Sequence, residues 1–126
     1  MSKQIINTSN APAPIGPYNQ SVKTGNLLFV SGQVALNAST GEMVNSDITE
    51  ETHQVLQNLK SILAEAGMNF SNIVKTTIFL SDMSLFSQVN EIYAKYFDGD
   101  FPARETVAVK GLPKNANVEI SVIAAE

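Results

Sequence analysis

Residues 101–109 of the chain read FPARETVAV, and residues 118–125 read VEISVIAA. In both runs apolar side chains recur at alternate positions, which is the pattern of a β-strand with one buried face. The segment GLPKNAN at residues 111–117 separates them, and its glycine and proline are typical of a loop between strands. We therefore expect these two strands to form a β-hairpin at the end of the chain.

Two residues in these strands are poorly explained by folding alone. Arg104 is the only arginine, against seven lysines, and Glu119 is a carboxylate between Val118 and Ile120. The commoner roles are a surface or interface salt bridge for the arginine and a solvated sheet position for the glutamate. The functional alternatives are a bidentate clamp on a substrate carboxylate for Arg104 and a buried acid–base group of raised pKa for Glu119.

The composition is that of a globular protein with one domain, residues 1–126. The chain is long enough to bury a core, and its 44% apolar and 16% charged residues are not those of a disordered protein. The net charge is −4 and the lysines are scattered. This disfavours a nucleic-acid partner, because phosphate binding requires clustered Lys and Arg.

The sequence also lacks the signatures of several kinds of site and of targeting segments. Without cysteine there is no disulfide framework and no thiol nucleophile, and one histidine leaves too few ligands for a zinc site. No P-loop, dinucleotide fingerprint or Ser/His/Asp order is present. No apolar run approaches a membrane span, and the N-terminus lacks the apolar segment of a signal peptide. We expect a cytoplasmic protein without a metal ion.

The first part of the chain predicts short strands separated by irregular backbone. We expect a strand at 3–8, an irregular Pro- and Gly-rich segment at 10–18, and a hairpin formed by 21–23 and 27–30. The second arm of this hairpin ends in Ser31-Gly32-Gln33, where a glycine leaves the backbone N–H open to a ligand.

Two helices are predicted, with a strand at 73–80 between them. The first covers residues 47–66, with Asp47 and Glu50 resembling a capping box and Gly67 placed to end the helix. Its apolar stripe is Ile48, Val55, Leu56, Leu59, Ile62, Leu63 and Ala66. The second is expected from a cap at Ser84 to Phe97, with a buried stripe of Phe86, Val89, Tyr93 and Phe97.

This order of elements predicts an α+β fold, a mixed β-sheet with two helices packed on one face. The strands carry apolar side chains on both faces, so a partner subunit should cover the other face.

Three further residues are less informative. His53, among polar neighbours that include Glu51, is interpreted as a solvated helix residue. Asn90 either caps a backbone group or orients a polar ligand, and Tyr18 is more often a packed loop aromatic than a binding group.

Several segments, taken together and in order, resemble one protein family. They are IGPY at 15–18, VSGQ at 30–33, IVKTT at 73–77, FPAR at 101–104, and LPK at 112–114 followed by VEI at 118–120. In these segments the chain is similar to the Rid family of reactive-intermediate deaminases, which are enamine/imine deaminases formerly described as translation inhibitors. The likeness runs from near Gly16 to the C-terminus.

The resemblance implies a chorismate-mutase-like fold and a homotrimer with ligand clefts between its subunits. It also implies hydrolysis of 2-aminoacrylate, 2-iminobutanoate and related imines to 2-keto acids and ammonia. Such imines are released by pyridoxal-phosphate enzymes, among them the threonine dehydratase of isoleucine biosynthesis. The deaminase itself would need no cofactor.

Carried over to this chain, the resemblance implies that Arg104 clamps the substrate carboxylate and that Glu119 activates or orients the attacking water. Ser31 and the backbone N–H of Gly32 would hold the polar end of the ligand. The cleft would be lined by Tyr18, Asn90 and Thr106.

The chain departs from the family pattern beside the arginine. Many relatives read Arg-Ser-Cys-Val where this chain reads RETV at residues 104–107. Thr106 keeps a small polar group without a thiol, and Glu105 should point to the opposite sheet face by strand alternation.

Two other functions compete with deamination. A non-catalytic binder of 2-keto acids that regulates branched-chain amino-acid metabolism would use the Arg104 clamp without needing Glu119. An RNA-acting translation inhibitor or nuclease is disfavoured by the acidic charge.

Overall fold

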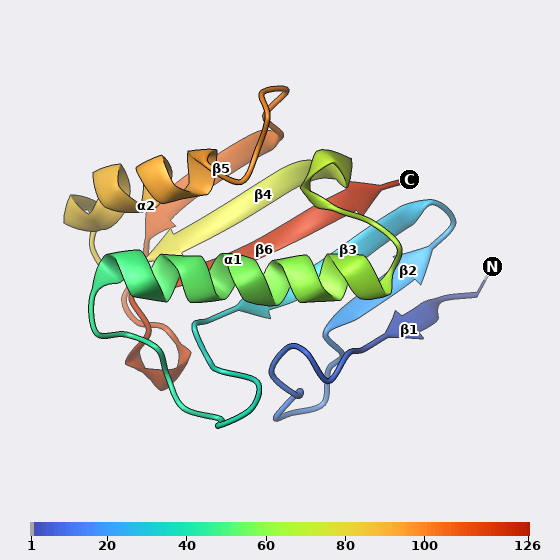
Figure 1. The fold of residues 1–126 in the computed structure, drawn as a ribbon, viewed down its shortest axis with the longest axis horizontal. Coiled ribbons are helices and arrows are strands. Elements are labelled where there is room, and N and C mark those ends of the chain that lie inside the picture. Colours follow the sequence, from blue (N-terminus) through green and yellow to red (C-terminus); the bar gives the residue numbers. More distant parts are fainter. Residues whose placement is uncertain (1) are drawn as a thin grey trace.

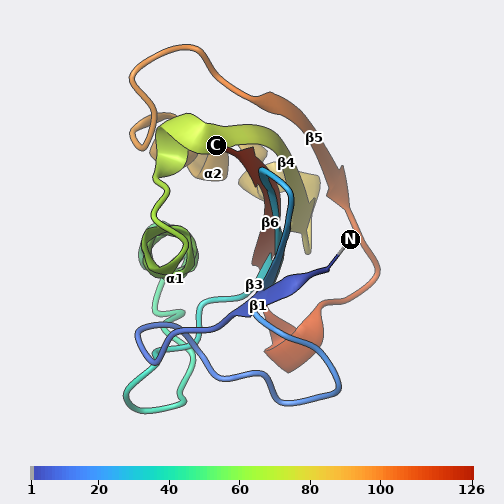
Figure 2. The same cartoon turned by 90° about the vertical axis from the view of Figure 1, so that its right-hand side faces the viewer.

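A computed structural model describes residues 2–126 as a six-stranded sheet with two α-helices on the same face (Figures 1 and 2). The strand order across the sheet is β1-β2-β3-β6-β4-β5. The strands are β1 (Gln4–Ile6), β2 (Ser21–Thr24), β3 (Leu27–Gln33), β4 (Ile73–Leu80), β5 (Ala103–Ala108) and β6 (Val118–Ala125), and the helices are α1 (Ile48–Glu65) and α2 (Phe86–Ala94). The mixed α+β architecture is therefore as expected.

The last two strands do not form the predicted hairpin. β5 pairs in parallel with β4 at the edge of the sheet, whereas β6 lies antiparallel between β3 and β4. The side chains of β6 that face the helices are all apolar and at most 4% exposed, which suits the central position. β5 has partly or fully exposed side chains throughout and stays at the edge. Alternation predicted both strands, but it carried no information about their partners.

Helix α1 confirms the first helix prediction to within one residue at each end. The Asp47 carboxylate accepts a hydrogen bond from the backbone N–H of Glu50 at 2.8 Å. Gly67 follows the helix with a φ of 73°, a conformation that glycine adopts without strain. The buried face contains the expected leucines and isoleucine and also a carboxylate, Glu51, that the apolar pattern did not place there.

Helix α2 is shorter than predicted and is not capped by Ser84 or by any other side chain. The Asp82 carboxylate accepts a hydrogen bond from the backbone N–H of Ser84 at 2.8 Å and starts a 3₁₀ turn that leads into the helix. Because this turn uses Asp82, Ser84 is not the cap. The helix ends at Ala94, before Phe97, which packs only at the border of the core. Val89 is buried as predicted.

The two helices leave the other sheet face, called the outer face below, uncovered in the single chain. In β4, Thr76 and Ile78 are buried beneath the helices, and the residues between them face outward. The strand registers place Phe29 and Val107 on the outer face, where they are 42% and 46% exposed. Figure 2 shows both helices on one side of the sheet. No helix in residues 2–126 is long and apolar enough to cross a membrane.

Candidate active site

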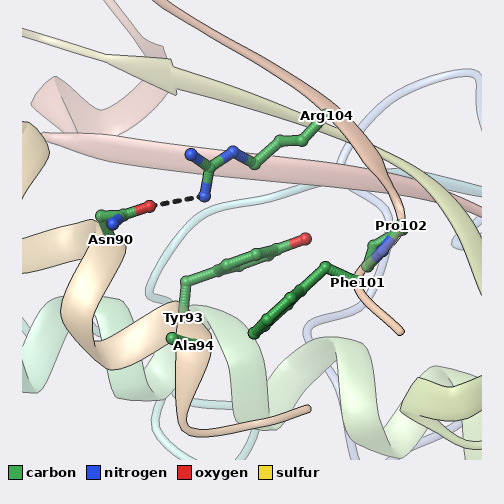
Figure 3. A pocket seen from close by; sticks show the side chains of 6 residues that line it. All are labelled: Asn90, Tyr93, Ala94, Phe101, Pro102 and Arg104. Carbon is green, nitrogen blue, oxygen red and sulfur yellow. Dashed lines mark hydrogen bonds between the residues drawn. The ribbon is translucent and has the colours of Figure 1, made fainter. Parts of the chain in front are cut away.

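Arg104 extends from β5 toward α2, where it is held by a hydrogen bond and two aromatic rings. Its Nη1 donates to Oδ1 of Asn90 at 2.7 Å. The guanidinium carbon lies 5.1 Å from the ring centroid of Tyr93 and 5.7 Å from that of Phe86. Figure 3 shows the guanidinium above the Tyr93 ring. These contacts orient the fork, and within residues 2–126 it has no carboxylate partner.

A cavity of about 390 Å³ opens beside this guanidinium. Its lining residues are Asn90, Tyr93, Ala94, Phe101, Pro102 and Arg104 (Figure 3). The Tyr93 hydroxyl donates to Oγ1 of Thr76 at 2.9 Å, and burial raises the pKa of Tyr93, so the phenol stays neutral. One fixed cation among apolar walls is suited to a small anion with an apolar substituent.

Thr106 lies on the same sheet face as Arg104, two residues further along β5. Its Oγ1 is buried and has no hydrogen-bond partner within residues 2–126. A buried hydroxyl without a partner costs about 1–3 kcal/mol. Thr106 is not among the residues that line the cavity, so its contact with a ligand stays a prediction. Glu105 points to the outer face, as expected, where its carboxylate lies 3.2 Å from Nζ of Lys75.

Glu119 lies on the outer face, the face opposite to that of Arg104. Its neighbours Val118 and Ile120 are buried beneath the helices, and its Cα partner Phe79 faces outward. The side chain is half-buried. Burial raises the pKa of the Glu119 carboxyl above its ordinary value, which favours a group that exchanges protons.

The Glu119 carboxylate packs directly against Gly32. A Cβ built on Gly32 would lie 2.8 Å from Cδ of Glu119 and even closer to Oε2. The pairing of β3 with β6 is irregular between Val30 and Gln33, so Ser31 and Gly32 form a bulge at this point. Glycine here therefore makes room for the carboxylate.

Replacement of Gly32 by alanine is expected to lower turnover in the imine hydrolysis expected from the sequence at least tenfold. The reason is that the added methyl group displaces the Glu119 carboxylate. Gly111→Ala is the matched control, since no atom lies within 4 Å of a Cβ built at Gly111. Initial rates and thermal melts of both variants provide the measurement. A Gly32→Ala protein as active as the Gly111→Ala protein would contradict the catalytic role expected for Glu119.

Glu119 also leads to a prediction about stability and pH. Its pKa is raised in the folded protein above the ordinary 4.5. Protonation of Glu119 therefore contributes to the free energy of unfolding. This contribution is complete when the pH is below the ordinary pKa, and it is lost as the pH rises through the pKa of the folded state. Glu119→Gln should therefore melt at a higher temperature than wild type at pH 7, and the difference should vanish near pH 4. Thermal denaturation between pH 4 and 8 tests this, and a difference that grows toward acid pH would refute it.

The seven predicted site residues fall into two groups, one that contains Arg104 on the helix-covered sheet face and one that contains Glu119 on the outer face. Asn90, Arg104 and Thr106 belong to the helix-covered side of β4 and β5. The second group is Tyr18, Ser31, Gly32 and Glu119. Within it, Oγ of Ser31 donates to the backbone carbonyl of Asn19, next to the exposed Tyr18, at 2.6 Å. A single chain does not place both groups around one cavity.

The sequence missed the aromatic walls of the cavity and the environment of His53. Tyr93 and Phe86 fit a core stripe, and that pattern does not distinguish a core side chain from one that stacks on an arginine. Phe101 was visible only as the first residue of the FPAR segment, and nothing in the sequence marked it as a wall of the cavity. The interpretation of His53 as solvated was wrong in part. It is half-buried, with Nδ1 hydrogen-bonded to the Tyr96 hydroxyl at 2.8 Å.

Comparison with known families gives a match over residues 8–126 to the model described as endoribonuclease L-PSP. The chain belongs to this family. Among L-PSP relatives it is 48% identical to a RutC family protein of Pyrococcus horikoshii, with 97% of each chain covered. It is 47% identical to the 2-iminobutanoate/2-iminopropanoate deaminase of Mus musculus, covering 98% of this chain and 92% of the relative.

Solved structures of L-PSP proteins agree with the fold. The Rid family protein YyfA of Yersinia pestis is 50% identical, with a TM-score of 0.96 over 99% of this chain and 100% of the other. TdcF of E. coli, solved with bound serine, is 38% identical, with a TM-score of 0.93 over 98% of each chain. The resemblance to the Rid family is thereby confirmed.

Within residues 2–126, His, Asp and Glu side chains form no group of three or more that could hold a metal ion.

Proposed function

We propose that the protein is an imine deaminase that hydrolyses 2-iminobutanoate, 2-iminopropanoate and related 2-imino acids to 2-keto acids and ammonia. The observation that carries this proposal is the Arg104 guanidinium, fixed by Asn90 at the wall of an apolar cavity. A 2-imino acid combines a carboxylate with a short apolar side chain and fits both features. Relatives that are 43–47% identical carry the corresponding deaminase name.

The complete site requires a second copy of the chain, and we propose a homotrimer with the sites between subunits. Arg104 and Glu119 lie on opposite sheet faces. A site that contains both therefore combines the Arg104 cavity of one subunit with the Glu119 carboxylate of a neighbouring subunit. The exposed apolar side chains of the outer face, such as Phe29 and Val107, support such an interface. Light scattering should give three times the chain mass of 13.6 kDa, and a monomeric mass would refute this arrangement.

In this site the protein positions reactants and moves protons. Arg104 binds the carboxylate, and the electrophilic C2 of the iminium faces a water held by Glu119. Water attacks C2 while the Glu119 carboxylate accepts its proton, giving a tetrahedral carbinolamine. The same carboxyl group returns the proton to the nitrogen. As the C–N bond breaks, the regenerated Glu119 carboxylate takes the proton of the carbinolamine hydroxyl, so that the 2-keto acid and ammonia form, and ammonia leaves with this proton as ammonium. Positioning and one proton relay suffice for a substrate that is already electrophilic.

A second candidate is a non-catalytic binder of 2-keto acids with a regulatory role. The Arg104 cavity favours it, because this cavity is formed within one chain and does not involve Glu119. Such a protein would bind 2-ketobutyrate and leave the rate of imine hydrolysis unchanged.

The deciding experiment generates 2-iminobutanoate in situ with a threonine dehydratase and follows 2-ketobutyrate formation with and without the protein. Under the proposed function, keto acid forms faster than by spontaneous hydrolysis. An unchanged rate together with calorimetric binding of 2-ketobutyrate would identify the regulator instead. Binding to RNA that persists at physiological salt would revive the RNA-acting alternative.

A further inference from the structure

Glu51, in the first turn of α1, is a carboxylate with no exposed surface. Its Oε2 accepts a hydrogen bond from the backbone N–H of Asn117 at 2.7 Å, and its Oε1 accepts one from Nδ2 of Asn117 at 3.0 Å. Within residues 2–126 the ion pairs are Lys23–Glu126 and Lys75–Glu105, so Glu51 has no cationic partner. Burying a carboxylate in this way is expensive, and an apolar side chain would often serve stability as well. A role beyond stability is therefore indicated.

Asn117 is bonded through all four of its polar groups. Besides its two bonds to Glu51, its Oδ1 accepts from Oγ of Ser81 at 2.8 Å, and its carbonyl accepts from the backbone N–H of Ser81 at 2.9 Å. Ser81 follows the last residue of β4, and Asn117 precedes the first residue of β6. The network therefore ties the start of α1, the end of β4 and the start of β6 to one another.

The start of β6 is the part of this central strand with the weakest sheet support. Pairing with β3 ends at Gln33 and Ile120, beyond the bulge, whereas pairing with β4 continues to Leu80 and Val118. Glu119 therefore has a strand partner on one side only. Since its carboxylate packs against Gly32 with no room for a methyl group, a small shift of β6 would move it out of place.

We propose that Glu51 is a positioning residue for the deaminase reaction. It holds Asn117 and thereby fixes the start of β6. This keeps the Glu119 carboxylate against the Ser31–Gly32 bulge. This inference rests on the proposed function for its effect on turnover. Its effect on the environment of Glu119 is measurable without turnover.

The test replaces Glu51 by glutamine, which offers one acceptor and turns an N–H₂ group toward a donor of Asn117. The kcat for 2-iminobutanoate should fall about tenfold while KM, set by Arg104, stays unchanged. In a Glu119→Gln background the same substitution should have no further effect on kcat, because the group it positions is gone. The double variant Glu51→Gln/Asn117→Asp restores matched donors and acceptors and should return kcat to within about twofold of wild type.

Glu50→Gln is the matched control, an exposed glutamate in the same helical turn, and should behave as wild type. If Glu51→Gln does not fold, Asn117→Ala removes only the side-chain bonds, and kcat should still fall several-fold. An unchanged kcat in a folded Glu51→Gln or Asn117→Ala protein would overturn the proposal. A loss of equal size in the Glu119→Gln background would overturn it as well.

Carboxyl ¹³C titration of Glu119 separates this inference from the proposed function. In wild type its pKa is raised by burial, and in Glu51→Gln it should move toward the ordinary value as the carboxylate leaves Gly32 and is solvated. An unaltered titration would refute the positioning role. If wild type shows no turnover but the titration responds as expected, the proposed function fails, whereas the inference that Glu51 holds the Glu119 carboxylate in place stands.

Discussion

Replacement of Arg104 by alanine is expected to lower kcat/KM for 2-iminobutanoate about a thousandfold. Two charge-assisted hydrogen bonds from the guanidinium to the substrate carboxylate, at roughly 2 kcal/mol each, correspond to about three powers of ten. Asn90 and the rings of Tyr93 and Phe86 orient the fork before the ligand arrives, so little side-chain entropy is lost on binding. Initial rates of 2-ketobutyrate formation, with the imine generated in situ, measure the loss.

Arg104→Lys is the matched comparison for charge. Lysine keeps the positive charge but lacks the planar fork and its stacking on Tyr93, so its kcat/KM should lie between those of wild type and the alanine variant. The binding of 2-ketobutyrate, measured by calorimetry, should weaken in the same order. An alanine variant with the kcat/KM of wild type would remove Arg104 from the site.

Replacement of Glu119 by glutamine is expected to lower kcat by a factor of about 10² to 10⁴, the usual contribution of a positioned general acid–base group. Glutamine has nearly the same shape and still fits against Gly32, but it cannot accept the proton of the attacking water. The dissociation constant of 2-ketobutyrate should change by less than about threefold, since the carboxylate clamp lies elsewhere. Turnover and calorimetry on the same preparation distinguish catalysis from binding.

Glu105→Gln provides the control for this experiment. Glu105 adjoins Arg104 in sequence, but its carboxylate is paired with Lys75 on the outer face. Its loss should leave kcat unchanged. If Glu119→Gln retains the kcat of wild type, Glu119 loses its assigned role as the general acid–base group.

The sequence was sufficient for those parts of the fold that depend on neighbours along the chain. Helix α1 was predicted to within a residue, because its stripe, its Asp47 cap and Gly67 are local signals. The position of β6 between β3 and β4 was not predicted, because strand pairing is a contact between distant segments. The cap of α2 was wrong because Asp82, not Ser84, accepts the backbone hydrogen bond, in the 3₁₀ turn that precedes the helix.

The candidate site shows the same division between local and distant information. The single arginine and the carboxylate in an apolar strand are visible as exceptions to their local patterns. Their placement on opposite sheet faces follows from the registers of β5 and β6 against β4, which no local pattern contains. The burial of Glu51 was likewise hidden, because among polar neighbours it resembled a solvated face until the loop at Asn117 covered it.

The central position of β6 has a consequence for how the protein is made. Of the six strands it is the last to leave the ribosome, and before it emerges β1–β3 and β4–β5 are two half-sheets with no strand joining them. Closing the sheet then depends on contacts between residues far apart in sequence, which slows folding. Until that step the inner edges of β3 and β4 are open to pairing with other nascent chains, so the growing polypeptide is most prone to aggregate before β6 emerges.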